Sequence, residues 1–373
     1  MSKETLFLDR KIRSVVQCSK MGEDRYRMDL LSQLPDVLLP WYREKKRDLP
    51  WRQDKEPYHV WLSEIMLQQT RVEAVKGYYT RFLQALPTVG DLAACDDETL
   101  HKLWEGLGYY SRVRNLKKAA VQIMELHSGI FPEEYEKIRA LPGIGDYTAG
   151  AISSICFDNP RAAVDGNVLR VISRLTENDT PIDLPARKRE VTEALEAIYP
   201  PEAGEFTQAL MELGATLCGP NWAPRCESCP CSHFCGGARH GTAERFPVKL
   251  PKREKRVEER TVFILSCDGK LALEKRPDRG LLAGLWQFPN VSGHLDTAEA
   301  LEAVERMGLR PREITKIIER KHIFTHIVWK MRGIYLEIAE ETGDFCWLTA
   351  AQIDAQAALP TAFRQFREEN DHV

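Results

Sequence analysis

Cysteine spacing is the feature that most constrains this chain. Ten cysteines occur in its 373 residues, and five of them lie close together. Cys226, Cys229 and Cys235 form a C-x2-C-x5-C run, and Cys218 precedes this run by seven intervening residues. Four thiolates in such a pattern are typical of a metal centre, either zinc or an iron–sulfur cluster. Cys231, inside the last gap, is a possible substitute ligand, and the alternative is a set of free buried thiols.

Length and composition exclude several classes of protein. At about 150 residues per domain, the length predicts two or three domains. The chain is 43% hydrophobic, its apolar runs fall short of the roughly 20 residues of a spanning helix, and its N-terminus lacks a secretory pattern. We therefore expect a cytoplasmic monomer that binds no membrane. The net charge of −3 argues against a nonspecific polycation, but nucleic acid stays possible because the position of the positive charge matters more.

Periodicity divides the chain into segments. Residues 1–28 show no clear period and are predicted to be a disordered extension. Residues 29–246 carry apolar side chains at three-to-four spacing, as in Val168–Leu175 and Phe206–Leu217, which predicts short helices. Residues 247–260 combine many charges with two prolines, which predicts a solvated linker.

Residues 261–373 have a different pattern. Apolar and β-branched residues flank an Asp268-Gly269 pair, which is a strong signal for a β-hairpin. Residues 327–338 are a further strand candidate, and two helical stretches are expected at 297–307 and 350–357. The predicted fold is therefore multidomain, with an all-α module followed by a small α+β module.

A glycine-rich turn in the helical module is a candidate phosphate site. In LPGIGDYTAGAI, Gly143 and Gly145 flank one apolar residue just before a helix rich in small residues. Such a turn lets backbone N–H groups point outward at a helix N-terminus, where they bind phosphate. This is the pattern of a helix-hairpin-helix motif. An ordinary glycine-rich turn between two helices is the alternative.

Two carboxylates are candidates for acid catalysis. Glu64 lies in the apolar segment HVWLSEIML, where desolvation would raise its pKa toward that of a general acid. Asp165, in VDGN, precedes a helical run. A solvated helix face for Glu64 and a helix N-cap for Asp165 are the structural alternatives. Together the pair matches the logic of glycosidases, in which one protonated acid and one ionised carboxylate flank an oxocarbenium-like centre.

Taken in order, LPGIG, VDGN and the cysteine loop resemble the helix-hairpin-helix DNA glycosylases of the endonuclease III superfamily. The segments SEIMLQQT, GLGYYSRVRNL, LLAGLWQFP and HIFTH resemble the MutY-type adenine DNA glycosylases in particular. The resemblance implies a helical glycosylase domain at 29–246 with an iron–sulfur loop at 218–235, and a Nudix-like 8-oxoguanine recognition domain at 261–373. It further implies excision of adenine mispaired with 8-oxoguanine or guanine in double-stranded DNA.

The resemblance also assigns roles to residues. Glu64 would protonate adenine N7 and Asp165 would stabilise the sugar cation, with Asn167 and Tyr147 in support. Related glycosylase-lyases carry a nucleophilic lysine where Tyr147 stands, so a monofunctional enzyme without Schiff-base chemistry is expected. The remaining assignments are an adenine pocket (Trp51, Arg52, Leu67, Gln208), DNA contacts (Gln69, Tyr109, Gly143, Gly145), 8-oxoguanine recognition (Phe324, Thr325, His326) and a 4Fe–4S cluster (Cys218, Cys226, Cys229, Cys235).

Sequence features argue against three other functions. A glycosylase for thymine or uracil mispairs would lack the C-terminal module with its Phe-Thr-His loop. A catalytically silent DNA-binding iron–sulfur sensor would not need both Glu64 and Asp165. A nucleotide-pool hydrolase needs the acidic REUxEExGU box, and ALEAVERMGL at 300–309 lacks that glutamate cluster. The adenine glycosylase therefore remains the preferred interpretation.

Overall fold

The computed structural model describes residues 28–251 and 254–367. Except for Met28, the predicted N-terminal extension lies outside this range. The chain divides into two compact units, the first comprising Met1–Arg71 and Gln122–Pro251, the second Val72–Val121 and Lys252–Val373. The second unit thus combines the middle of the helical region with the C-terminal module. Among the described residues, no helix is long and apolar enough to span a bilayer.

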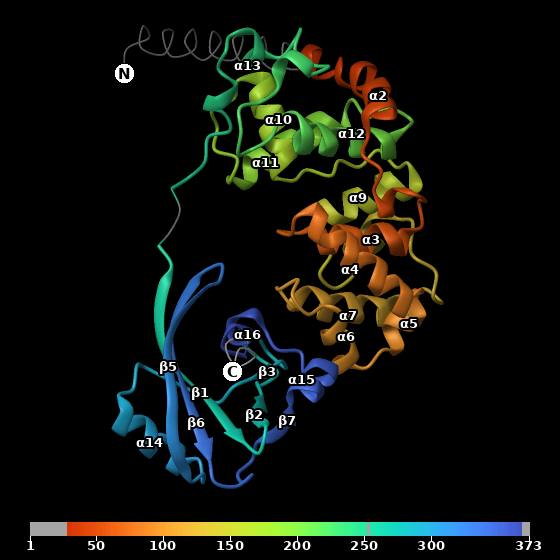
Figure 1. Ribbon diagram of the computed structural model, residues 1–373. Coiled ribbons are helices and arrows are strands. Elements are labelled where there is room, and N and C mark those ends of the chain that lie inside the picture. The colour runs from red at the N-terminus through yellow and green to blue at the C-terminus, as the bar shows by residue number, and fades with distance from the viewer. Residues whose placement is uncertain (1–27, 252–253, 368–373) are drawn as a thin grey trace, which may run out of the picture. The chain divides into compact units, whose positions relative to one another are not determined.

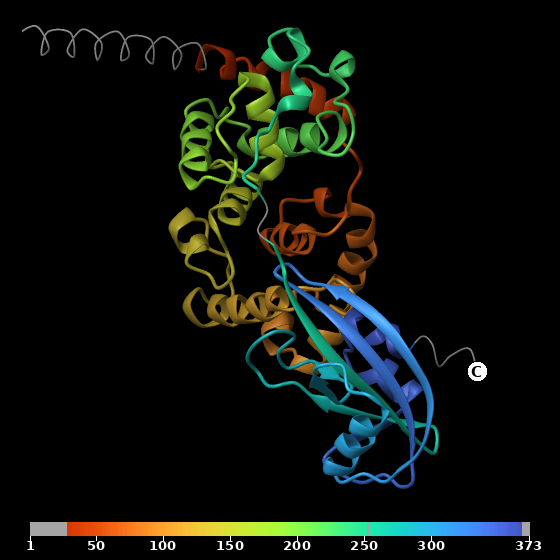
Figure 2. The same ribbon diagram turned by 90° about the vertical axis from the view of Figure 1, so that its left-hand side faces the viewer.

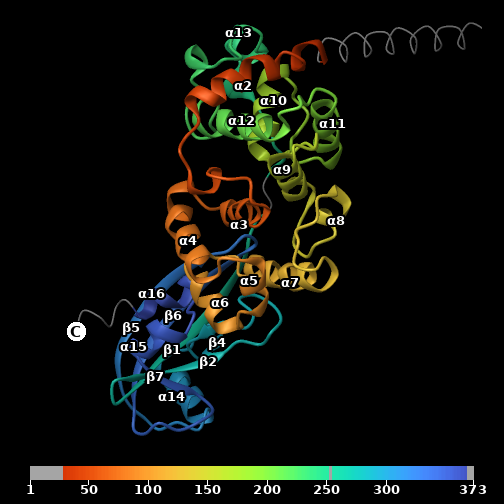
Figure 3. The same ribbon diagram turned by 90° about the vertical axis from the view of Figure 1, so that its right-hand side faces the viewer.

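The first unit is helical, as the periodicity predicts. Helices α2 and α12 lie side by side, and α12 also packs on α9 and α10 (Figures 1 and 3). Their apolar faces form one buried cluster that includes Leu34, Leu38, Phe206 and Leu213. The elements are α2 (Leu34–Lys45), η1 (Pro50–Arg52), α3 (Pro57–Leu67), α8 (Tyr135–Arg139), α9 (Asp146–Phe157), α10 (Gly166–Thr176), α11 (Pro185–Glu196), α12 (Ala203–Thr216), η2 (Cys226–Ser228), α13 (Gly236–Arg239) and η3 (Ala243–Arg245).

Four helices in the middle of the chain precede the sheet of the second unit. The hydroxyl of Thr88 accepts from Asp91 N–H and forms a capping box that starts α5, and Asp96 caps α6 by accepting from Thr99 N–H. Phe82 and Trp104, both fully buried, meet edge to face. The elements are α4 (Val72–Ala85), α5 (Val89–Ala94), α6 (Asp97–Leu103) and α7 (Ser111–Leu126), the last of which continues into the first unit.

A seven-stranded sheet forms the C-terminal part of the second unit. Its order is β3-β2-β1-β6-β5, with β4 also paired to β1 and β7 to β2. Strands β1 and β6 run parallel, whereas the other pairs are antiparallel (Figure 2). The strands are β1 (Arg256–Cys267), β2 (Lys270–Lys275), β3 (Trp286–Gln287), β4 (Asn290–Ser292), β5 (Pro311–Ile323), β6 (Ile327–Ile338) and β7 (Cys346–Thr349).

The hairpin expected at Asp268-Gly269 is confirmed. Both residues have positive φ, 47° and 74°, and Cys267 pairs with Lys270 across the turn. Two positive φ angles are typical of the turns whose twist matches antiparallel strands. Strand β1 begins at Arg256, inside the segment whose charge predicts a linker, because its first residues pair in parallel register with β6. The domain boundaries at 246, 260 and 261 themselves stay predictions.

Helices cover both faces of the sheet. The predicted helices at 297–307 and 350–357 are present as α14 (Thr297–Arg306) and α15 (Ala350–Gln356), and α16 (Thr361–Arg367) follows. Alternation along the strands sends neighbouring residues to opposite faces. Ile264 on β1 therefore packs with Phe363 and Phe366 of α16, and Phe263 packs with Val304 of α14.

Gly333 on β6 tests this packing. A Cβ at this position would lie 2.5 Å from Cε1 of Phe366, whose ring is fully buried. We expect Gly333→Ala to lower the free energy of unfolding by about 1–3 kcal/mol, because the core must shift to accept the methyl group. Gly77→Ala on α4 is the matched control, since its Cβ would meet only Arg81 Nη1 at 3.5 Å. Chemical denaturation should show Gly77→Ala to be neutral or stabilising, and equal stability of both variants would contradict the packing.

Candidate active site

Glu64 lies at the centre of a helix that is buried on all sides. Every residue of α3 from Val60 to Met66 is buried, and α3 packs against α9. The Glu64 side chain has almost no contact with bulk water, because the residue is only 6% exposed. A solvated helix face, the structural alternative for this residue, is therefore excluded.

The Tyr147 hydroxyl is the hydrogen-bond partner of this carboxyl group. It donates to Glu64 Oε2 at 2.7 Å, and the sulfur of Met211 lies 4.0 Å from the same hydroxyl. Burial raises the pKa of Glu64 to about 7; the Tyr147 hydrogen bond and the charge of Arg52 oppose this rise, and the charge of Asp165 adds to it. Glu64 can thus hold a proton near neutral pH and still release it to a substrate, as a general acid must.

Asp165 is the N-cap of α10, so the helix N-cap that is the structural alternative for this residue is confirmed. Its Oδ1 accepts from the backbone N–H groups of Asn167 and Val168, both at 2.8 Å, and its Oδ2 accepts from Asn167 Nδ2 at 2.6 Å. Capping and catalysis are compatible here. Three N–H donors fix the carboxylate, and its charge reaches Glu64. The expected pair of carboxyl groups therefore meets in one site.

Two buried arginines link α10 to the cysteine loop. Arg170 donates to Asn167 Oδ1 at 2.9 Å and to the Cys218 carbonyl at 2.8 Å. Arg174, one turn later, donates to Cys218 Sγ at 3.3 Å and to the Gly219 carbonyl at 3.0 Å. Sequence reasoning missed both residues. Their spacing from Asn167, three and seven residues along one helix, was the available signal.

A third buried charge, Glu212, also escaped the sequence reasoning. It is fully buried on α12, and it accepts from Arg47 Nε at 2.7 Å and from Arg52 Nη2 at 2.8 Å. Burial would raise the pKa of Glu212, but the hydrogen bonds and charges of the two arginines outweigh burial and lower it. One turn earlier on α12, Gln208 Oε1 accepts from the Tyr42 hydroxyl at 3.0 Å. Arg47 and Arg52, two cations of the segment 43–52, thus form internal ion pairs with Glu212.

Three other predicted adenine-pocket and DNA-contact residues of the first unit lie in or just after η1 and α3. Trp51 is buried in η1, and Leu67 is the last residue of α3. Gln69 follows in the next turn, exposed and with a φ of 58°. A positive φ in a residue other than glycine is strained, and such strain is often associated with functional sites. Gln69 is thus an exposed residue with an unusual backbone conformation, and its role in filling the gap stays a prediction.

The glycine-rich turn has helix-hairpin-helix geometry. It joins α8 to α9, with Gly143 at a φ of 79° and Gly145 as the N-cap of α9. Both glycines are exposed, whereas Ile144 between them is buried and anchors the turn. Tyr147 is the second residue of α9. The helix that offers its N–H groups outward thus also supplies the partner of Glu64.

The cysteine loop gathers sulfur donors against the core of the first unit. Cys218, Cys229 and Cys235 pack on the edge of the cluster formed by α2, α10 and α12, whereas Cys231 is 2% exposed and lies within it. Burial raises the pKa of Cys226, and the neighbouring thiols of Cys229 and Cys218 add to this rise, so these sulfurs lie near one another. Within the described residues, no three His, Cys, Asp or Glu side chains are arranged to hold a metal ion.

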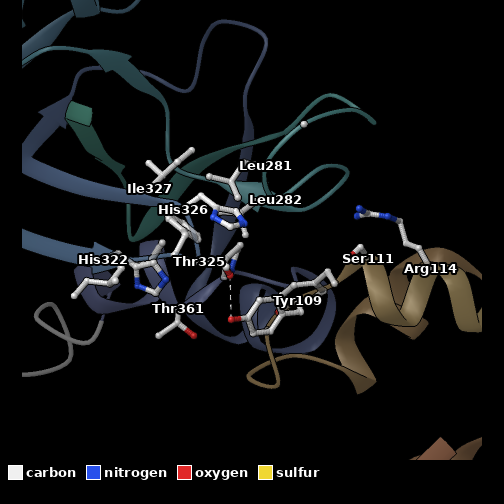
Figure 4. Close-up of a pocket in the computed structure, with 17 residues that line it drawn as sticks. Tyr109, Ser111, Arg114, Leu281, Leu282, His322, Thr325, His326, Ile327 and Thr361 are labelled. Atoms are coloured by element: carbon white, nitrogen blue, oxygen red, sulfur yellow. Dashed lines mark hydrogen bonds between the residues drawn. The ribbon is translucent and has the colours of Figure 1, made fainter. Parts of the chain in front are cut away.

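The second unit contains a separate cavity of about 380 Å³, which we call the Tyr109–Thr325 pocket. Figure 4 shows that the Thr325 hydroxyl points at the Tyr109 ring, to whose oxygen it donates at 3.2 Å. Tyr109 is exposed and has a φ of 47°. Thr325 and His326 are also exposed, but Phe324 packs on Trp329 with ring centroids 4.9 Å apart. The lining is Gly108–Ser111, Arg114, Gly280–Leu282, His322–Ile327 and Pro360–Ala362.

Comparisons with known proteins agree with both parts of this geometry. Residues 62–201 match the HhH-GPD superfamily of base excision DNA repair proteins, and residues 260–369 match the NUDIX domain. A curated adenine DNA glycosylase of Mus musculus is 34% identical over 92% of this chain and 80% of its own length. The Schizosaccharomyces pombe enzyme of the same name is 30% identical over 93% of both chains. This chain belongs to the adenine DNA glycosylase family.

A solved structure supports the helical part. A thermostable thymine-DNA glycosylase aligns with a TM-score of 0.51 and 27% identity, covering 58% of this chain and 98% of its own. The chain is therefore a base-excision glycosylase, a hydrolase of N-glycosyl bonds. The fold class predicted from the sequence, a helix-hairpin-helix glycosylase followed by a Nudix-like module, is confirmed.

Burial of Glu64 predicts a pH-dependent stability difference. Because the folded-state pKa is about 7, the folded protein binds the proton more tightly than the unfolded chain, and stability falls as the pH rises from about 4.5 to 7. Glu64→Gln removes this penalty. Its free energy of unfolding should exceed that of the wild type by up to about 3 kcal/mol at pH 8, and the difference should vanish near pH 4. Denaturant unfolding over this range measures it.

The matched control is Glu193→Gln, since Glu193 is an exposed residue of α11. Its stability difference from the wild type should stay flat over the same pH range. A flat difference for Glu64→Gln as well would show that the Glu64 proton has no preference for the folded state.

Proposed function

We propose that this chain removes adenine paired with 8-oxoguanine, or with guanine, in double-stranded DNA. The single observation that carries the proposal is the buried Glu64 carboxyl group, whose pKa lies at about 7 and which faces the charge of Asp165. A protonated acid beside an ionised carboxylate suits departure of a base from a sugar through an oxocarbenium-like state. The names of the relatives support adenine as the base.

The roles of the residues follow from their contacts. Glu64 gives its proton to N7 of the flipped adenine, the C1′–N9 bond breaks with its electron pair going to the base, and the positive charge stays on the sugar. Asp165 stabilises that cation, held in place by Asn167 and the backbone. Tyr147 orients Glu64 through its hydrogen bond. Water then adds at C1′ and gives up a proton to the Glu64 carboxylate, which restores the acid, and no lysine adduct forms because position 147 is tyrosine.

Recognition of the opposite base is assigned to the Tyr109–Thr325 pocket. 8-Oxoguanine carries a hydrogen on N7 where guanine has an acceptor, so a hydroxyl that accepts there favours the oxidised base. The Thr325 hydroxyl is already placed in the cavity, and His326 is exposed beside it. Phe324 supports the loop from its contact with Trp329. Gln69 and Tyr109 are proposed to fill the gap left by the flipped base, and Gly143 and Gly145 to bind phosphate.

Base release from defined duplexes tests the function. Under single-turnover conditions, wild-type protein should release adenine from 8-oxoguanine:A fastest, from G:A more slowly, and from A:T not at all. Glu64→Gln should bind these duplexes normally yet lose about 10²–10⁴-fold in excision rate, because the proton donor is gone. Thymine release from G:T duplexes would favour a thymine glycosylase instead. Near-normal excision by Glu64→Gln would contradict its role as the acid.

We also propose that Cys218, Cys226, Cys229 and Cys235 hold a 4Fe–4S cluster. An all-sulfur donor set suits such clusters. The contact between Arg174 and Cys218 Sγ supports this assignment, because hydrogen bonds to ligand sulfurs stabilise thiolates and tune the cluster. Cys231 is the less suitable ligand, since it lies inside the apolar cluster. When bound, the cluster would tie the loop to the end of α12, and the chemistry on the base would remain with Glu64 and Asp165.

Metal analysis of purified protein tests the cluster. We expect a brown protein with broad visible absorption and about four irons per chain, as in other four-cysteine cubane sites. Cys226→Ser should lose this absorption, whereas Cys231→Ser is the matched control and should keep it. One zinc in a colourless protein would contradict the assignment, and loss of iron in Cys231→Ser alone would exchange the ligand.

A further inference from the structure

A partly buried carboxylate just after α6 holds the segment that forms one wall of the Tyr109–Thr325 pocket. Glu105 is 15% exposed at its side chain. Its Oε1 accepts from the Leu359 backbone N–H at 3.0 Å and from Arg364 Nη2 at 2.6 Å. Its Oε2 pairs with Lys102 Nζ, also at 2.6 Å. One carboxylate therefore ties the helical part of the second unit to α16 and to the chain that precedes it.

Lys102 holds the other end of the same segment. Its ammonium group donates to the carbonyls of Ile353 and Ala357, at 3.4 and 3.5 Å, where α15 ends. A cation near the C-terminal end of a helix interacts favourably with the carbonyl groups there. Lys102 thus contacts the first residue of the buried segment 357–360, and Glu105 contacts Leu359 near its other end. Figure 1 shows α15 lying beside α6, and the two helices are in contact.

Segment 357–360 leads directly into the Tyr109–Thr325 pocket. Pro360, Thr361 and Ala362 line the cavity on one side, and Gly108–Ser111, three residues beyond Glu105, line it on another. Thr325, on the hairpin loop, bonds to Tyr109 of that second wall. A shift of Leu359 relative to Glu105 would therefore change the spacing between two walls of the cavity.

We infer that Glu105 is a positioning residue for opposite-base recognition: its charge sets the distance between the 360–362 and 108–111 walls of the Tyr109–Thr325 pocket. The inference rests on the proposed function of that pocket. Discrimination between two bases that differ by one oxygen and by the position of one hydrogen depends on small distances, so a wall free to move accepts both bases more equally. Removing the charge of Glu105 leaves Lys102 and Arg364 without their common partner.

The test compares Glu105→Gln with a matched ion pair. The amide of the Glu105→Gln variant keeps an oxygen for the Leu359 N–H but removes the charge that holds Lys102 and Arg364. The control is Glu98→Gln, because Glu98 pairs with Lys275 and joins the same two parts of the chain, yet both side chains are about half exposed. Exposed pairs of this kind contribute little. Arg364→Gln is a second variant that removes the charge pair from the opposite side.

The readout is the preference for 8-oxoguanine:A over G:A, taken from dissociation constants and single-turnover rates on both duplexes. We expect Glu105→Gln and Arg364→Gln to reduce this preference by about 2- to 30-fold, through weaker handling of 8-oxoguanine:A with G:A little changed. Glu98→Gln should keep the wild-type preference. A role in stability alone would lower the melting temperature and slow both duplexes equally, which would overturn the inference.

Two further outcomes separate this inference from the proposed function. If the wild type prefers 8-oxoguanine:A and both variants keep that preference, the positioning role is wrong while the function stands. If the wild type itself shows no preference for 8-oxoguanine:A, the proposed recognition by the pocket fails, and this inference fails with it.

Discussion

The hydrogen bond between Tyr147 and Glu64 is the contact on which the first unit depends. It joins α3, which has no solvent-facing side along Val60–Met66, to the first turn of α9. A carboxyl group in such a place must be neutral or find donors, because an ionised group buried without partners is costly. One hydroxyl hydrogen bond is enough to orient the carboxyl group, but it is too little to stabilise the full negative charge of an ionised Glu64. The site therefore favours a proton held ready for transfer.

The position of Tyr147 has a second consequence. Gly145 caps α9 and Tyr147 is its second residue, so a phosphate bound at the turn and the acid inside the fold are separated by a few bonds of one rigid helix. Docking of DNA on the turn would fix the place of the Tyr147 hydroxyl without any loop movement.

Two carboxyl groups in one site have been given opposite surroundings. Glu64 receives one hydroxyl, whereas Asp165 receives three N–H donors at the start of α10. The two carboxyl groups thus differ in their surroundings rather than in their chemical class. Arg52 lowers the pKa of Glu64, but its guanidinium is itself held by the buried Glu212. Glu212 therefore limits how far that cation can ionise the acid.

Patterns among neighbouring residues predicted those features of the fold and the site that depend on neighbouring residues alone. The Asp268-Gly269 turn, the strand at 327–338 and the burial of Glu64 each follow from neighbouring residues, and each is confirmed. Glu212 and Glu105 could not be found in this way, because their partners lie far along the chain: Arg52 is 160 residues from Glu212, and Leu359 is 254 from Glu105. Arg47 and Arg52, five residues apart, both bind the distant Glu212.

The way in which the second unit is assembled decides how its proposed recognition role can be studied. Glu105, Lys102 and Arg114 join its α4–α7 segment to its C-terminal part, through Leu359, Ile353 and the Ala283 carbonyl, the last at 2.8 Å. Cutting the chain near Arg260 would expose these partly buried charges together with the apolar surfaces beside them. Loss of activity in such a fragment would then report damage to the helical part as much as loss of base recognition. Point substitutions at the pocket leave these contacts intact, so they separate recognition from folding where truncation cannot.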